Sequence, residues 1–240
     1  MAPRRLGRAL AAVAFAGPIA YAALITALGF TWAGYVPVRD SMSVLGAVDS
    51  PVRHVTNVGG FAGLGVVLLC FAGAYAWAVG RRTMAAVAVV FIALAGVFMI
   101  AVAFFPCDSG CIDVTATGRW HSYTSTPPAI LLPLAAMASG GVFWARPDLF
   151  TRRWATASFW LGFASLMTGP ALWLAATQPM LGLLQRVGIG LALVWVSGTG
   201  WMLYSRAGRA LESTKAGPTN GPAPTHHVLP QLDSNQQPAD

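Results

Sequence analysis

The sequence predicts an all-α, polytopic membrane protein in which six transmembrane helices form one bundle. Three observations lead to this fold class: an apolar composition, six long runs without charged residues, and an uneven distribution of Lys and Arg between the runs. The chain is 56% hydrophobic and only 10% charged, and its mean hydropathy is +0.61. Because soluble domains carry about 25% charged residues, this composition leaves too little polar surface for a water-soluble fold of this length.

The uncharged runs have the length that a membrane span requires. A helix needs about 20 predominantly apolar residues to cross a hydrocarbon core of roughly 30 Å, and five of the six runs are longer. The last run is short by itself, but it reaches this length with residues 179–184 if the Arg186 side chain extends to the interface. The runs cover residues 9–38, 55–80, 83–107, 122–145, 154–185 and 187–205.

We expect one helix in each run, with aromatic residues near the helix ends, where interfacial belts form. Gly17-Pro18 and Gly169-Pro170 predict a bend in the first and fifth helices, because proline removes a backbone donor and clashes with the preceding turn. Such bends are usually structural, but two bent helices can also open a cavity toward the outer face. The expected helices cover residues 10–32, 56–79, 84–105, 121–144, 154–177 and 179–204.

The basic residues predict the orientation of the bundle. If the N-terminus is cytoplasmic, eleven Lys and Arg residues lie on the cytoplasmic side and four lie on the other side. This asymmetry follows the positive-inside rule for six spans with both termini inside, and we expect the chain in a cytoplasmic (inner) membrane. A cleaved signal peptide ending near Ala20-Tyr21-Ala22 is the alternative for the N-terminus, but the apolar stretch of residues 10–32 exceeds the usual length of about 7–15 residues.

These patterns divide the chain into three parts. Residues 1–9 are expected to form a cytoplasmic N-terminus, residues 10–205 the transmembrane domain, and residues 206–240 a disordered cytoplasmic tail. The tail is rich in Pro, Gly, Ser, Thr, Gln and Asn and lacks apolar periodicity, which is typical of disordered segments. Because all connections between the spans are short, any functional site must be built from loops and helix ends.

Polar side chains are concentrated on the predicted outer face, in and next to residues 33–55 and 106–120. This face carries four of the eight acidic residues and both histidines outside the tail. We interpret the two segments as a polar pocket. For the same side chains, a hydrogen-bonded plug that ties the two loops together is favoured over an acid–base or metal-assisted hydrolytic site. Asn57, one turn inside the membrane, needs a polar partner because an unsatisfied amide is costly in lipid. The candidate ligand-binding residues are Asp40, Ser43, His54, Asn57, Asp108, Asp113, His121 and Arg186.

Cys107 and Cys111 lie in the sequence Cys-Asp-Ser-Gly-Cys, on the oxidising side of the membrane in this orientation. A disulfide between them is therefore the favoured interpretation. The alternatives are a zinc site, which needs two further ligands such as His54 and His121, and a redox-active cysteine pair. We predict no bound metal and no cofactor.

The outer segments also carry a family resemblance. The sequence resembles a bacterial integral membrane family catalogued as domain of unknown function 998, over about residues 10–203. The resemblance implies a compact multi-span bundle without an established activity and a shared outer-face feature, and it supplies no catalytic assignment. It is carried by Ser43-Val44-Leu45-Gly46, Pro51, Asn57, the block from Phe105-Pro106 through Cys107-Asp108-Ser109-Gly110-Cys111, and Thr115-x-x-Gly118-x-x-His121.

The favoured function is the binding of a lipid headgroup or a small polar ligand in the outer pocket, in an envelope-accessory or sensing role. The alternative is a membrane-embedded hydrolase that acts on a lipid or lipid-linked substrate. In that case His121 would be the base, Asp108 its orienting partner or a metal ligand, and Ser43 the nucleophile. The sequence does not decide whether the protein is an enzyme.

Two other function classes fit the sequence less well. Ion-coupled transport requires ionisable groups near the membrane midplane, and the uncharged runs contain none apart from the neighbouring Arg186. Nucleic-acid binding requires a basic patch, whereas the basic residues here are distributed by topology. The expected partners are the lipid bilayer and a lipid or small polar ligand, and no nucleic acid.

Overall fold

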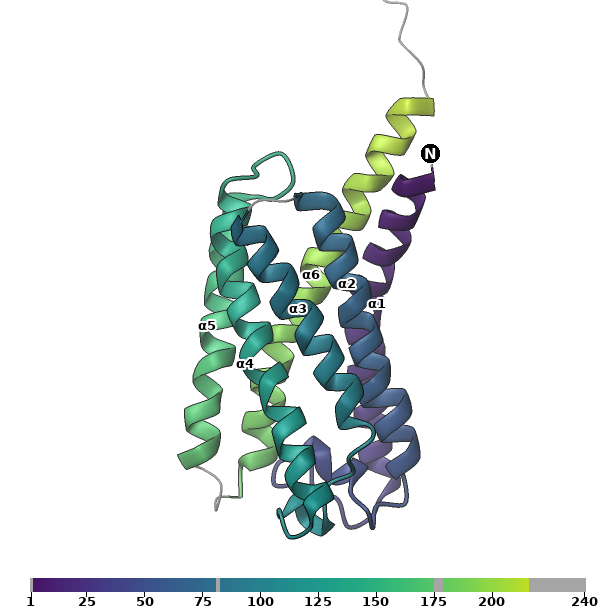
Figure 1. The fold of residues 1–240 in the computed structure, drawn as a ribbon, viewed down its shortest axis with the longest axis vertical. Coiled ribbons are helices and arrows are strands. Elements are labelled where there is room, and N and C mark those ends of the chain that lie inside the picture. The colour runs from purple at the N-terminus through teal and green to yellow at the C-terminus, as the bar shows by residue number, and fades with distance from the viewer. Residues whose placement is uncertain (1, 81–82, 175–178, 216–240) are drawn as a thin grey trace, which may run out of the picture.

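The computed structural model describes residues 2–80, 83–174 and 179–215, in which six long helices lie side by side (Figure 1). These residues contain no β-strand, which confirms the all-helical fold class. Five of the helices are long and apolar enough to cross a membrane, and α5 is not among those five. The helices are α1 Ala2–Thr31, α2 Gly63–Val79, α3 Thr83–Val102, α4 Ala116–Trp144, α5 Arg152–Leu174 and α6 Leu181–Lys215.

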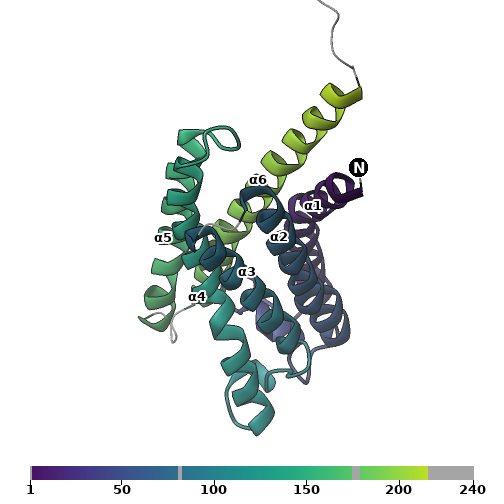
Figure 2. The ribbon, with the colours of Figure 1, turned by 45° about the horizontal axis from the view of Figure 1, so that its top comes forward.

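The helices form a closed arrangement in which each packs against its neighbours in sequence, and α6 returns to pack against α1. In the tilted view, α6 runs between α1 and α5 (Figure 2). The start of α1 and the end of α6 lie at the same end of the bundle (Figure 1), which we call the termini end. Residues 32–54 and 103–115 lie at the opposite end, which we call the loop end.

Aromatic side chains fill the half of the bundle nearer the termini end. Phe71 of α2 lies edge-on against Trp195 of α6, with ring centroids 5.2 Å apart. One turn further along α2, the Tyr75 hydroxyl donates to Ser139 Oγ of α4 at 2.8 Å. All four residues are fully buried, so these side chains tie α2, α4 and α6 together in the interior.

The outward faces of the helices carry large apolar side chains. Val66, Val90, Trp160 and Val194 belong to four different helices, and each is more than half exposed. In water such a surface would be costly, whereas a hydrocarbon environment accepts it. The outer surface therefore agrees with a protein that is embedded in a lipid bilayer.

Small residues let α2 and α3 approach closely. A Cβ atom on Gly65 would lie 2.6 Å from the Gly96 carbonyl oxygen, and one on Gly96 would lie 2.9 Å from the Gly65 oxygen. Any larger side chain at either position would push the two backbones apart. Gly65 and Gly96 therefore form an intramolecular packing contact between the two helices.

Three helix boundaries differ from those expected. The second helix begins as a π-helix, η2 Val55–Ala62, and α4 begins at Ala116 rather than at residue 121. Thr115 explains the earlier start of α4, because its Oγ1 caps the helix by accepting from the Gly118 amide at 3.1 Å. The expected third helix ended at residue 105, whereas residues 103–105 form a turn after α3.

The two termini are also more helical than expected. Residues 2–9 belong to α1, and residues 206–215, which we assigned to a disordered tail, continue α6. The physical reason is local: residues 206–215 contain Arg, Ala, Leu, Glu and Lys, which favour helix, and Gly217-Pro218 supplies the stop signal only afterwards. The rest of the predicted tail and residues 175–177 of the fifth predicted helix lie outside the described residues.

Candidate functional site

The two polar loops contact each other at the loop end. The first contains a short 3-10 helix, η1 Met42–Gly46, and the second contains another, η3 Ser109–Cys111. The amide of Val48 donates to the Cys107 carbonyl at 2.9 Å, and Ser109 Oγ donates to Asp49 Oδ2 at 2.6 Å. Asn57 Nδ2 donates to the Gly46 carbonyl at 3.1 Å, whereas its buried Oδ1 has no hydrogen-bond partner among the described residues.

Arg186 attaches the first loop to α6. Its guanidinium donates to the carbonyls of Pro37 and Asp40 and to the Tyr35 hydroxyl. Two backbone hydrogen bonds from residues 182–183 to residues 38–39, of 2.9 and 3.1 Å, continue this contact. The positive charge that the sequence suggested as a ligand contact is therefore used to hold the loop in place.

The Asp40 carboxylate is engaged by its own neighbour. Arg39 Nε donates to Asp40 Oδ1 at 2.7 Å, and the Val36 amide donates to Oδ2 at 2.7 Å. The hydrogen bonds from Arg39 hold the pKa of the Asp40 carboxyl below its usual value. Because Arg39 is largely exposed, water screens this ion pair, and its role is to close the loop locally.

Asp108 caps the turn that leads into α4. Its Oδ2 accepts from the amides of Val114 and Thr115 at 2.9 and 2.7 Å, and its Oδ1 accepts from Thr115 Oγ1 at 2.7 Å. These hydrogen bonds, with that of the Thr115 amide the strongest cause, lower the pKa of the Asp108 carboxyl. A Cβ atom on Gly118 would overlap this carboxylate, so glycine is required there. Asp108 is therefore a structural cap whose oxygens are already occupied.

His121 is buried beside a disulfide. Its side chain lies in the first turns of α4 and is only 3% exposed, and Nδ1 lies 2.7 Å from the Phe105 carbonyl oxygen. Cys107 and Cys111 form a disulfide with an S–S distance of 2.02 Å, which confirms the favoured interpretation of this cysteine pair. His54, proposed with His121 as a zinc ligand, is exposed and lies against Arg53 instead.

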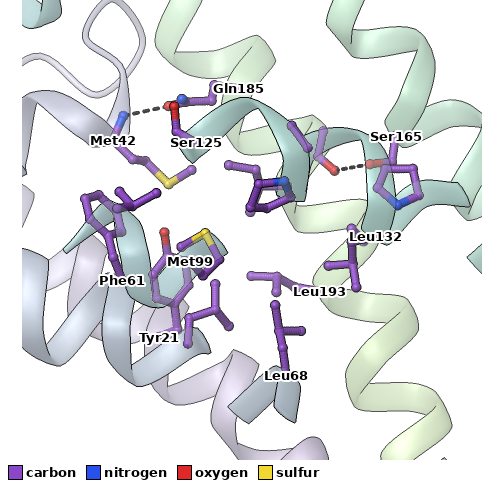
Figure 3. Close-up of a pocket in the computed structure, with 18 of the residues that line it drawn as sticks. Tyr21, Met42, Phe61, Leu68, Met99, Ser125, Leu132, Ser165, Gln185 and Leu193 are labelled. Carbon is purple, nitrogen blue, oxygen red and sulfur yellow. Dashed lines mark hydrogen bonds between the residues drawn. The ribbon is translucent and has the colours of Figure 1, made fainter. Parts of the chain in front are cut away.

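A cavity of about 170 Å³ lies inside the bundle, between the aromatic half and the loop end (Figure 3). Residues of all six long helices, η1 and η2 contribute to its wall. Most of these side chains are apolar. The apolar ones are Met42, Phe61, Leu64, Leu68, Met99, Val102, Pro128, Ala129, Leu132, Pro133, Ile189, Ala192 and Leu193; Gly169 and Gly188 also line the cavity, and Tyr21 contributes a ring with a hydroxyl group.

Polar groups line more than one part of the wall, and one group of them lies toward the loop end. Figure 3 shows Met42, Ser125 and Gln185 together on one side, where the Met42 amide donates to Gln185 Oε1 at 2.7 Å. On another wall, Ser165 Oγ donates to the Gly188 carbonyl at 2.7 Å. Oε1 of the Gln185 side chain accepts the hydrogen bond from the Met42 amide. Its Nε2 donates to no group among the described residues, so it can donate to a ligand.

The predicted site residues are divided between the loops and the cavity. Ser43 lines the cavity, whereas the other seven ligand-binding candidates do not. Asp113 accepts from Ser122 Oγ at 2.8 Å on the exposed side of α4. Among the described residues, no hydrogen bond joins the side chains of Ser43, Asp108 and His121, so the hydrolase hypothesis gains no support from the contacts.

Sequence reasoning missed the polar residues that face the cavity from within the spans. Ser165 and Thr168 are one turn apart in an otherwise apolar segment, and Ser125 and Gln185 lie near the loop-end starts of the expected helices 121–144 and 179–204. The signal was present, since polar residues within a span usually face the bundle interior. It was weak because hydroxyl groups in a helix can also bond to their own backbone, as Thr168 does with the Ser165 carbonyl at 2.6 Å.

Comparisons with known proteins identify the family but not an activity. The family described as "Protein of unknown function (DUF998)" matches residues 15–202, which include α2 to α5, most of α1 and α6, both polar loops and every residue that lines the cavity. No curated protein and no solved structure matches the chain. Because the match covers far more than half of the sequence, this multi-helix membrane protein belongs to the DUF998 family.

Proposed function

We propose that the protein spans the inner membrane six times and binds a lipid, or a similar lipid-soluble molecule with one polar end, in the cavity between its helices. The single observation that carries the proposal is the distribution of groups in the wall: apolar side chains over most of it, and Ser43, Ser125 and Gln185 toward the loop end. The polar end of the ligand would face these three residues on the extracytoplasmic side. The apolar part would lie among Leu68, Leu132 and Leu193 and the other apolar residues.

Support for the sixth span comes from packing. The helix α5 contacts both α4 and α6 along the bundle, and its 23 residues are long enough to cross the hydrocarbon core at about 1.5 Å per residue. Both ends of the described chain lie at the same end of the bundle (Figure 1), as an even number of spans requires. The excess of basic residues near that end favours a cytoplasmic location.

The size of the cavity suits part of a lipid chain. An apolar cavity of about 150 Å³ accepts benzene, so about 170 Å³ holds a chain segment or ring of similar volume. A ligand that arrives from the bilayer leaves surroundings as apolar as the cavity. The preference of the ligand for the cavity over the bilayer must therefore come from the shape of the wall and from hydrogen bonds at its polar end. The Gln185 amide can donate one of these hydrogen bonds.

Two wall residues give the ligand a route from the bilayer. Ala129 of α4 and Gly169 of α5 line the cavity and are exposed. Because α4 and α5 pack side by side, these residues favour a lateral entrance between the two helices. A ligand entering there would not have to pass the loops that close the loop end.

The test is to place a large side chain at Gly169, a wall residue at the proposed entrance, where an added Cβ atom would meet no heavy atom within 4 Å. We expect Gly169→Leu to reduce the amount of lipid that copurifies with the protein by at least about tenfold, which corresponds to about 1.4 kcal/mol of binding free energy. Native mass spectrometry of the detergent-purified protein would measure the retained lipid.

Gly141→Leu is the matched control, since Gly141 of α4 also has open space around its Cβ position and does not line the cavity. The control protein should retain lipid as the native protein does. Equal lipid retention by both variants, with unchanged melting temperature, would contradict the proposal.

A further inference from the structure

A second cluster of groups, separate from the cavity wall, lies where the second loop meets α4. One ligand atom each from Cys107, Cys111 and His121 lies within 4.8 Å of the other two. Cys107 is 1% exposed and His121 3% exposed, whereas Cys111 is partly exposed. The cluster can therefore be reached from the loop end through Cys111.

The hydrogen bond of His121 determines which ring nitrogen is free. The Phe105 carbonyl can only accept, so Nδ1, at 2.7 Å from it, carries the hydrogen and donates. In the neutral ring Nε2 then holds a lone pair, and this buried atom has no hydrogen-bond partner in the described structure. Histidines that bind metals are oriented in this way, with one nitrogen donating to a backbone carbonyl and the other facing the ion.

We propose that Cys107, Cys111 and His121 form a metal site for Zn²⁺, or a similar soft cation, once the disulfide is reduced. Reduction by a dithiol breaks the S–S bond: the dithiol loses two electrons and two protons and becomes a disulfide, and the chain gains two thiols. Binding of the divalent ion then releases both thiol protons, because the ligands are the thiolates. In the disulfide form the sulfurs carry no such charge, so the site exists in only one redox state.

Metal binding requires the S–S bond to break and the three side chains to adjust so that both Sγ atoms and His121 Nε2 face the ion. Tetrahedral zinc with Zn–S of about 2.3 Å and Zn–N of about 2.0 Å places its ligand atoms roughly 3.5–3.8 Å apart, within the 4.8 Å that the three ligand atoms already span. Two thiolates and an imidazole favour Zn²⁺ over Mg²⁺ or Ca²⁺, which prefer oxygen ligands. Asp108 adds no fourth ligand, since its oxygens accept from Val114 and Thr115, and the remaining position would hold water.

The test uses the full chain, purified in detergent with Cys70→Ser so that only the two paired cysteines remain. The protein is reduced with a phosphine, which has no thiol to compete for the ion, and is titrated without oxygen with Co²⁺ and then Zn²⁺. We expect one ion per reduced chain, with thiolate-to-cobalt charge-transfer absorption that Zn²⁺ abolishes. The oxidised protein should show neither the absorption nor the bound ion.

Variants assign the ligands. His121→Ala should weaken metal binding by at least about tenfold, since even residues that only support a metal ligand contribute about 10–100-fold to metal affinity. Cys111→Ser should abolish the charge-transfer absorption that is typical of a site with two thiolates. His54→Ala, which removes the exposed histidine of the same face, should bind as the native chain does. Failure of the reduced chain to bind either ion, or binding unchanged in His121→Ala, would overturn the proposal. Because these residues do not line the cavity, neither result bears on lipid retention.

Discussion

Asp108, which the sequence suggests as a catalytic or metal-binding carboxylate, has a structural role. In the sequence it stands between two cysteines and near a histidine, a combination that is compatible with a catalytic carboxylate. In the structure both oxygens accept hydrogen bonds from the turn before α4, so the carboxylate positions the start of that helix. The charge is stabilised by donors that remain in place, which is why the pKa is lowered.

The pH dependence of stability should therefore carry a contribution from Asp108. A carboxyl with a lowered pKa in the folded state stabilises the protein above its unfolded pKa of about 3.9, and this contribution is lost as pH falls through the folded pKa. We expect Asp108→Asn to unfold more readily at neutral pH and to show a weaker loss of stability on acidification below about pH 4. Thermal unfolding in detergent between neutral and acid pH would measure both effects.

Asp113→Asn is the control for this prediction, since Asp113 is exposed and accepts a single hydrogen bond from Ser122. It should follow the acid profile of the native protein. An unchanged profile in Asp108→Asn would show that the cap contributes nothing to acid sensitivity.

At the scale of elements, the loop end is held together by contacts between segments that are far apart in sequence. The first loop contacts α6 through Arg186 and contacts the second loop through the Cys107 carbonyl. The loop also places Met42 and Ser43 in the cavity wall. Movement of this loop would therefore alter the polar end of the cavity.

Arg186→Gln tests this attachment. A hydrogen bond to a charged group contributes about 1.5–3 kcal/mol, and water can replace part of it at this half-buried position, so we expect a loss of about 1–3 kcal/mol in the free energy of unfolding. Backbone amide hydrogen exchange should become faster at Met42, Gly182 and Leu183, which donate across this contact.

Arg53→Gln serves as the comparison, because the Arg53 side chain donates only to the nearby Val48 carbonyl and to the ring of its neighbour His54. Its exchange rates at the same three amides should match those of the native protein. If both substitutions had equal effects on these amides, Arg186 would have no particular role in holding the loop on α6.

At the scale of the whole molecule, orientation decides what each end of the bundle contacts. The loop end carries the disulfide, the cap and the polar side of the cavity, while the termini end carries most of the basic residues. From the positive-inside rule, we propose that the termini end faces the cytoplasm. The disulfide fits this orientation, because disulfides persist in oxidising compartments.

Cysteine labelling of intact cells can test the orientation. In a Cys70→Ser background, Val38→Cys at the loop end and Pro147→Cys at the termini end introduce exposed thiols. We expect a membrane-impermeant maleimide to label residue 38 in intact cells and residue 147 only after the membrane is made permeable. The reverse pattern would contradict the proposed orientation and would remove the oxidising environment expected for the disulfide.

The helical class, the approximate positions of the helices and the disulfide could all be predicted from the order of the residues alone. Apolar run length and cysteine spacing are local properties, and lipid accepts any helix that satisfies its own backbone hydrogen bonds. The boundaries that were missed are local too, but they depend on caps such as Thr115, which the hydropathy pattern does not show.

The hydrogen-bond partners and positions of the polar side chains, in contrast, depend on how the helices pack. Arg186, Asp108 and Asn57 were recognised as important, but their partners lie in backbone carbonyls and amides that the fold brings near. Likewise, Ser125 and Gln185 meet in one cavity wall only because α4 and α6 pack around it. The type of a residue shows that its buried polar group needs a hydrogen-bond partner. Which group becomes that partner depends on which groups the fold brings close to it.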